Sequence, residues 1–163
     1  METETCMACG LRTSKVDGPV HKYLISSPGC WAKYGEVLAR EYENSEYMAV
    51  HALTVDAYAL QHPGIENLRT INSANIHLAS MYCHFKLGKS IGELSQVKQK
   101  LTKHKDQFVW MDPPENVSEI TVADILESES ASEHRKSVLK WSEYIYEQWE
   151  AHHSYIASLV SIE

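Results

Sequence analysis

Apolar residues recur with a helical period along most of the chain after residue 27. The first such stretch begins at Ser27-Pro28 and is followed by the polar run Glu43-Asn44-Ser45. Pro28 fits a first-turn position, where its missing amide hydrogen costs nothing. Within the stretch, apolar side chains recur about every 3.6 residues, the period of one helix face. These side chains are Trp31, Tyr34, Val37, Leu38 and Tyr42. We therefore predict a helix over this stretch.

Turn and capping signals divide the rest of the chain into further helices. A second helix is predicted from about Glu46 to His62, because Pro63-Gly64 is a strong terminator. A third is predicted from about Asn67 to Lys86. Capping boxes then open three more helices, the last of which extends to about residue 159. They are Ser90-x-x-Glu93, Thr121-x-x-Asp124 and Ser130-x-x-Glu133.

Two stretches do not follow the helical pattern. Residues 104–120 carry Pro113 and Pro114, which cannot lie inside a helix, so we expect an irregular crossing of the surface there. Residues 20–25 show a weak strand pattern. The sequence thus predicts an all-α fold, a single-domain helical bundle with an N-terminal zinc knuckle. We expect the knuckle and a loop in residues 1–26 and the bundle in residues 27–163.

Composition and charge argue against several classes of protein. The chain of 163 residues has a formal net charge of −7, and its positive residues are scattered rather than clustered. A nucleic-acid groove needs a basic stripe, and an anionic membrane surface would repel this chain. No stretch approaches the roughly 20 apolar residues of a membrane span, and the first residues lack the features of a secretory signal. We expect a cytoplasmic protein that binds neither nucleic acid nor membrane, for which a homo-oligomer is possible.

Cysteine spacing gives the most specific chemical signal. Cys6 and Cys9, in Cys-Met-Ala-Cys-Gly, can hold one metal ion from a single tight turn, and Cys30 supplies a third thiolate. The imidazole of His62, in Gln-His-Pro-Gly, would complete the tetrahedron that zinc prefers. If the first two helices run antiparallel about Asn44, Cys30 lies opposite position 58, one helical turn from His62. We therefore predict a zinc ion held by these four side chains.

Other interpretations of the same residues stay open. His21 is a rival fourth ligand, because it lies between the knuckle and Cys30 in the chain. Disulfides or a redox dithiol would use the same cysteines, but no export signal and no βαβ setting accompany them. Cys83 falls deep in the third predicted helix, about 24 Å away at about 1.5 Å per residue, and is not expected to join. A thiolate-rich set of four protein ligands favours a structural zinc.

A pair of histidines forms a second candidate site. An antiparallel pairing of the second and third predicted helices places His77 beside His51 at mid-height of the bundle. Tyr58 and Ser73 then lie nearer the zinc end. Asp56 is rotated by about 140° from His51 on an ideal helix, so we expect it to face another neighbour. The pair could line a small-ligand pocket, with histidine as acid and base, or could form a hydrogen-bonded network in the core.

Two segments of the chain resemble a known family. Residues 27–42 (Ser-Pro-Gly-Cys-Trp-Ala-Lys-Tyr-Gly-Glu-Val-Leu-Ala-Arg-Glu-Tyr) and residues 50–64 (Val-His-Ala-Leu-Thr-Val-Asp-Ala-Tyr-Ala-Leu-Gln-His-Pro-Gly) are similar to a family of small, mostly bacterial proteins of unknown function. Members of that family typically begin with a Cys-x-x-Cys-Gly knuckle, as at Cys6 to Gly10 here. The ending Trp141…Trp149…His152-His153 resembles theirs as well. The resemblance implies a cytosolic protein and supplies no mechanism.

Three functions compete on these observations. The first is a non-enzymatic helical module in which a structural zinc supports a binding or scaffolding role. The alternative is an enzyme or small-ligand binder that uses a pocket at His51 and His77. A catalytic zinc with water as fourth ligand, as in nucleotide deaminases, ranks last. The deaminase pattern is absent, because Cys30 is followed by Trp31-Ala32 and no proline precedes Cys6.

Overall fold

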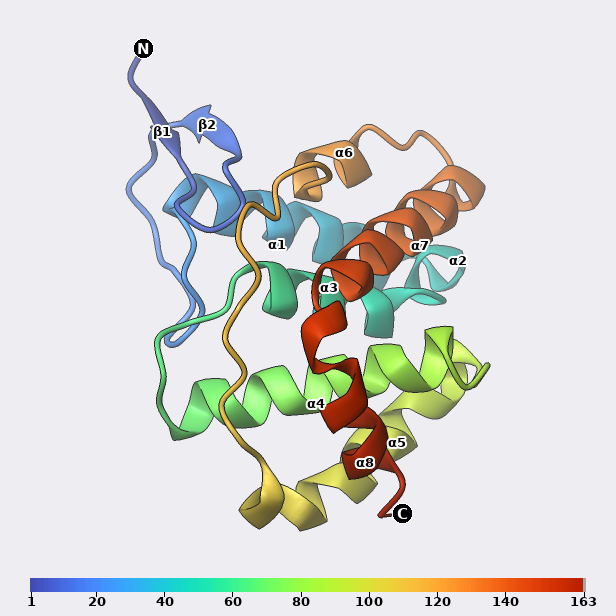
Figure 1. Ribbon diagram of the computed structural model, residues 1–163. Coiled ribbons are helices and arrows are strands. Elements are labelled where there is room, and N and C mark those ends of the chain that lie inside the picture. The colour runs from blue at the N-terminus through green and yellow to red at the C-terminus, as the bar shows by residue number, and fades with distance from the viewer. Residues whose placement is uncertain (163) are drawn as a thin grey trace.

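In the computed structural model, which describes residues 1–162, helices follow one another from Pro28 to Val160 (Figure 1). The α-helices are α1 (Pro28–Glu43), α2 (Ser45–Met48), α3 (His51–Gln61), α4 (Leu68–Phe85), α5 (Leu94–Leu101), α6 (Val122–Leu126), α7 (Ala131–Gln148) and α8 (His153–Val160). Short 3-10 turns lie at Ile91–Glu93, Thr102–Gln107 and Glu150–His152. The described chain is therefore mostly helical, as predicted.

The starts of several helices agree with the sequence signals. Ser27 caps α1, because its Oγ accepts a hydrogen bond from the amide of Cys30 at 3.1 Å, and Pro28 follows in the first turn. The capping boxes at Ser90 and Thr121 are both complete. The second predicted helix, in contrast, is divided into α2 and α3. The break at residues 49–50 lets the short α2 pack against both α1 and α7.

Helix α3 lies at the centre of the fold and packs against α1, α4 and α7. Nearly all of its residues are buried, so it carries no solvent-facing stripe. Two tryptophans of the C-terminal region hold its last turn. The Trp141 indole donates to Gln61 Oε1 at 3.1 Å, and the Trp149 indole donates to the Leu60 carbonyl at 3.2 Å. These bonds fix the position of the helix end that carries His62.

The prediction of a single long C-terminal helix was wrong, because the chain bends at Trp149. Its backbone departs from helical geometry there, and a short 3-10 turn separates α7 from α8. Helix α7 packs mainly on α3, whereas α8 packs on α4, where Ile156 and Leu159 are buried. A straight helix could not follow both neighbours, so the bend lets one apolar stripe cover two helices.

The strands lie elsewhere than predicted. β1 (Thr3–Thr5) and β2 (Arg12–Ser14) form an antiparallel hairpin on either side of the cysteine knuckle, with Glu4 opposite Thr13. Residues 20–25, expected to be extended, form bends and loop instead. Figure 1 shows the hairpin beside the N-terminal end of α1, and the Glu4 carboxylate accepts a hydrogen bond from the Gly29 amide at 2.9 Å.

The expected irregular crossing is present between α5 and α6. After the 3-10 turn at Thr102–Gln107, residues 108–121 carry neither helix nor strand, and this segment runs along the molecule to α6 (Figure 1). The Gln61 side-chain amide donates to the carbonyls of Val117 and Ile120, at 3.0 and 2.7 Å, and so ties the crossing to α3. None of the helices within residues 1–162 has the length and apolar character needed to cross a bilayer.

Candidate metal centre

The knuckle forms the turn of the N-terminal hairpin. The Cys6 amide donates to the Leu11 carbonyl at 2.8 Å, and the Gly10 amide donates to the Cys6 carbonyl at 2.9 Å. Gly10 has a φ of +75°, a left-handed conformation that glycine adopts without a steric penalty. The fold of this turn therefore depends on the glycine that follows the second cysteine, and it leaves both cysteine side chains buried.

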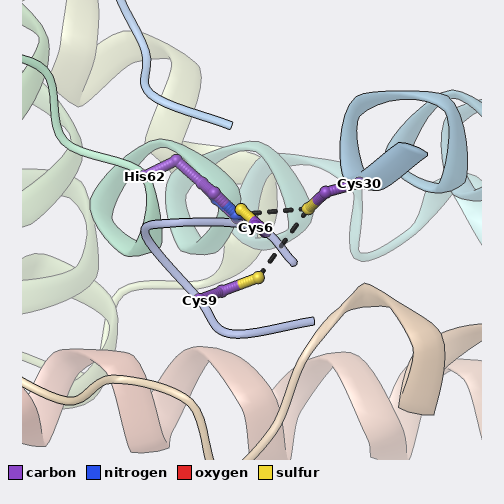
Figure 2. Close-up of side chains that lie close together, drawn as sticks. All are labelled: Cys6, Cys9, Cys30 and His62. Atoms are coloured by element: carbon purple, nitrogen blue, oxygen red, sulfur yellow. Dashed lines mark hydrogen bonds between the residues drawn. The ribbon is translucent and has the colours of Figure 1, made fainter. Parts of the chain in front are cut away.

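Cys30 enters the same space from the first turn of α1. It is the third residue of that helix, where the helix dipole favours a negative charge. Its Sγ lies 3.8 Å from the Sγ of Cys9. Figure 2 shows the cysteine side chains and the His62 imidazole directed toward one another from the hairpin, α1 and the end of α3.

His62 follows the last residue of α3 and is fully buried. Its Nδ1 lies 2.8 Å from the Tyr58 carbonyl, and its Nε2 lies 3.3 Å from the Sγ of Cys30. A carbonyl can only accept, so Nδ1 carries the hydrogen, and Nε2 of the neutral ring presents its lone pair to the cluster. This is the orientation of a histidine ligand whose other nitrogen is held by a backbone carbonyl.

The separations fit a four-coordinate ion. The donor atoms of Cys6, Cys9, Cys30 and His62 all lie within 4.8 Å of one another, and all four residues are buried. A tetrahedral zinc with bonds of about 2.3 Å to sulfur would separate its sulfurs by about 3.8 Å. The distance between Cys9 and Cys30 is 3.8 Å. The four side chains can therefore hold one metal ion with little movement.

Hydrogen bonds among the three thiols shift their pKa values. A bound cation would replace the hydrogens of these bonds. Hydrogen bonds from Cys30 and Cys9 hold the pKa of Cys6 far below its ordinary value. The hydrogen bond to Cys6, together with that to Cys9 and with burial, raises the pKa of Cys30. For Cys9, the bond from Cys30 acts to lower the pKa, but the bond to Cys6 and burial outweigh it and raise the pKa to about 12. All four cysteines of the chain are free.

Tyr58, expected on the side of the histidine pair that is nearer the zinc end, lies against this cluster. Its hydroxyl is 3.5 Å from the Sγ of Cys30. Its ring stacks on His62 and on Tyr34, each with a centroid separation of 3.9 Å. Burial raises the pKa of the Tyr58 hydroxyl, so it stays protonated and can donate to a sulfur. The contact between Cys30 and position 58 is the one predicted from antiparallel helices.

The other candidate ligands lie outside the cluster. The Nδ1 atom of His21 accepts hydrogen bonds from the amides of Tyr23 and Leu24, at 3.2 and 3.3 Å. Burial removes water from the His21 ring and so disfavours its charged form, which lowers the pKa of His21. Cys83 is buried in α4, where it lines a cavity together with residues of α5 and α8.

The two mid-bundle histidines each bind a buried carboxylate. His51 Nδ1 lies 2.9 Å from Glu41 Oε1, and His77 Nδ1 lies 2.7 Å from Asp56 Oδ1. Asp56 was expected to face a neighbour other than His51, and in the structure it binds His77, the other member of the pair. Ser73 is half-buried on α4. That these residues line a ligand pocket stays a prediction.

Two buried polar networks, which were not predicted from the sequence, surround these carboxylates. Glu41 is fully buried and also receives hydrogen bonds from Thr54 at 2.6 Å and from His134 at 2.8 Å. Burial alone would raise the pKa of Glu41, but the bonds from His134, His51 and Thr54 outweigh it and lower the pKa. The signal was present, because Glu41 continues the stripe of Tyr34 and Val37 along the buried face of α1.

The second network surrounds Asp56, which is also fully buried. Lys98 Nζ lies 2.6 Å from Asp56 Oδ1, and Ser80 Oγ donates to Oδ2 at 2.6 Å. Burial acts to raise the pKa of Asp56, but the Lys98 ammonium and His77 outweigh it and lower the pKa. No pattern in the sequence points to Lys98, because it belongs to a short helix whose other lysine, Lys100, is exposed.

The fold and the cluster together define a helical protein with a thiol-rich candidate metal centre at the junction of a hairpin and two helices. The chain belongs to a family of unknown function, DUF5946, whose family model matches residues 4–150. The match includes every residue of the cluster. No curated protein and no solved structure matches the chain. The family confirms the resemblance seen in the sequence and names no activity.

Proposed function

We propose that Cys6, Cys9, Cys30 and His62 hold one zinc ion whose role is structural. The observation that carries the proposal is the convergence of three thiols and one imidazole within 4.8 Å, all of them buried. Zinc prefers this donor set and number, and four protein ligands leave no position for a reacting water. The ion would connect the hairpin, the first turn of α1 and the end of α3.

The donor set also argues against a catalytic zinc. Three thiolates would place a net negative charge on the complex and weaken the ability of zinc to acidify a bound water. The ligand atoms are buried, so a substrate would have no direct approach to the ion. The proposed role of the protein is accordingly binding or scaffolding through its helices. The zinc ion would hold the N-terminal hairpin in place against them.

Metal analysis of protein purified without a metal-affinity tag tests this proposal. We expect about one zinc per chain, and we expect His62→Ala to lose that zinc while His21→Ala keeps it. A strong chelator should lower the melting temperature of the parent protein, because binding free energy contributes to folding in such sites. Protein that contains no metal, or that melts at the same temperature after zinc is removed, would contradict the proposal.

A second candidate function, acid–base chemistry or ligand binding at His51 and His77, is favoured by one observation. Both side chains are partly exposed, 24% and 17%, while their Nδ1 atoms are held by fully buried carboxylates. A carboxylate that orients one ring nitrogen leaves the other to act as an acid or base. In His51 this second nitrogen, Nε2, lies 3.4 Å from the hydroxyl of Tyr42. A thermal-shift screen of metabolites tests this, since His51→Ala and His77→Ala should abolish a shift that the parent protein shows. A shift that both variants retain would count against this site.

A further inference from the structure

A cavity of about 490 Å³ lies beside the C-terminal end of α4. Helices α5 and α8 both pack against α4 and form the walls of the cavity. The turn that follows α4 contributes Leu87 and Lys89 to the rim. The volume falls within the range of about 300–1,000 Å³ that is usual for small-molecule sites. The cavity belongs neither to the cysteine cluster nor to the two carboxylate networks.

The lining of the cavity is largely apolar. Val97 from α5 and Val160 from α8 face it, and Leu87 at the rim is 51% exposed. Exposing a large aliphatic side chain beside a cavity lined by other aliphatic groups loses hydrophobic stabilisation. An apolar chain that entered this space would cover Leu87 and fill the cavity between the helices.

The charged groups of the lining are mostly basic. Lys89 and Lys100 contribute to it, and Glu93 is the acidic member. The Glu93 carboxylate already accepts hydrogen bonds from the amide and hydroxyl of Ser90, at 2.7 and 2.9 Å. Within a chain of net charge −7, this local excess of positive charge favours an anionic group at the rim.

We propose that this cavity binds a single-chain amphiphile with an anionic head, of which a medium-chain fatty acid is the simplest example. The aliphatic chain lies against Leu87, Val97 and Val160. The head lies at the rim, where Lys89 and Lys100 neutralise its charge. Both parts of the ligand are needed, since the lining offers an apolar interior and a basic edge.

Calorimetric titration of the intact protein with dodecanoate tests the proposal. Saturable binding is expected, with weaker binding of dodecanol and the weakest binding of dodecyltrimethylammonium, because only the first carries a negative head. Decanoate should bind roughly tenfold more weakly than dodecanoate, since it buries two fewer methylene groups. The absence of saturable dodecanoate binding, or equal binding of the cationic amphiphile, would overturn the proposal.

Variants then place the ligand in this cavity. Val97→Trp fills it and should abolish binding, and Ala157→Leu provides a smaller filling change if the tryptophan variant fails to fold. Lys100→Ala should weaken dodecanoate binding several-fold and leave dodecanol binding unchanged. Lys33→Ala, on α1 and partly exposed, is the matched control and should bind as the parent does. Parent-like binding by both filling variants, or equal loss in the Lys33 control, would overturn the assignment.

Discussion

The Nε2 atom of His62 lies 3.3 Å from the Sγ of Cys30, although 32 positions separate the two residues in the chain. The antiparallel packing of α1 and α3 produces this contact, and it also sets the Tyr58 hydroxyl 3.5 Å from the same sulfur. The cluster is therefore a tertiary feature, since the knuckle alone supplies only Cys6 and Cys9. A metal ion held here would bind three separate segments of the chain to one another.

The first prediction concerns the knuckle. Cys9→Ser should lose zinc and lower the melting temperature by at least about 10 °C, because the ion contributes its binding free energy to folding. Metal analysis and thermal melts measure the two effects. Cys83→Ala is the control, since Cys83 is buried outside the cluster, and it should keep its zinc. A Cys9→Ser protein that loses zinc and keeps its melting temperature would show that the ion is not structural.

The second prediction concerns the hydroxyl beside Cys30. Tyr58→Phe removes a donor that can stabilise the Cys30 thiolate, and groups around a metal site typically change affinity about 10–100-fold when lost. We expect roughly tenfold weaker zinc binding in a chelator competition assay. Tyr34→Phe is the matched control, because Tyr34 stacks on Tyr58 and is also buried. Equal affinities for both variants would assign Tyr58 to packing alone.

The third prediction tests how the hairpin packs on α1. A Cβ atom at Gly29 would lie 2.9 Å from the Thr13 Cβ and 3.0 Å from a Glu4 oxygen, so alanine should push the hairpin away from the helix. Gly29→Ala should therefore destabilise the protein by about 1–3 kcal/mol and weaken zinc binding. Gly35→Ala, on the same helix and with open space around it, should instead stabilise slightly. Denaturant melts of the two variants should move in opposite directions.

Much of this arrangement could be predicted from the sequence, for reasons specific to particular residues. The helix start at Ser27-Pro28 and the turn at Pro63-Gly64 are local signals, and together they fix where Cys30 and His62 meet. The hairpin was missed because its strands have three residues each, too few for an alternating pattern. The bend at Trp149 was missed because it depends on contacts with α3 and α4, which leave no trace in local propensity.

The fourth prediction concerns the buried carboxylate of Glu41. Its pKa is lowered in the folded protein, so it contributes stability that is present above its unfolded pKa of about 4.3. That contribution should be lost as the pH falls through the lower folded pKa. Glu41→Gln should cost on the order of 3 kcal/mol near neutral pH, and this difference from the parent should shrink in acid. Denaturant melts between neutral pH and about pH 3 measure it.

The control for this experiment is Glu36→Gln, which removes an exposed carboxylate paired with Lys33 at 3.3 Å. Exposed pairs contribute about 0–1 kcal/mol, so this variant should follow the parent at every pH. A difference between Glu41→Gln and the parent that does not change with pH would show that the Glu41 charge is not the source of its stabilisation.

X-ray absorption at the zinc edge tests the central claim most directly, because it reports the metal and its ligands together. The account predicts zinc with three sulfur ligands at about 2.3 Å and one nitrogen ligand at about 2.0–2.1 Å. Loss of the nitrogen signal in His62→Ala, and its retention in His21→Ala, would complete the assignment. Absence of zinc, fewer than three sulfur ligands, or a water oxygen in the fourth position would contradict a structural site built from Cys6, Cys9, Cys30 and His62.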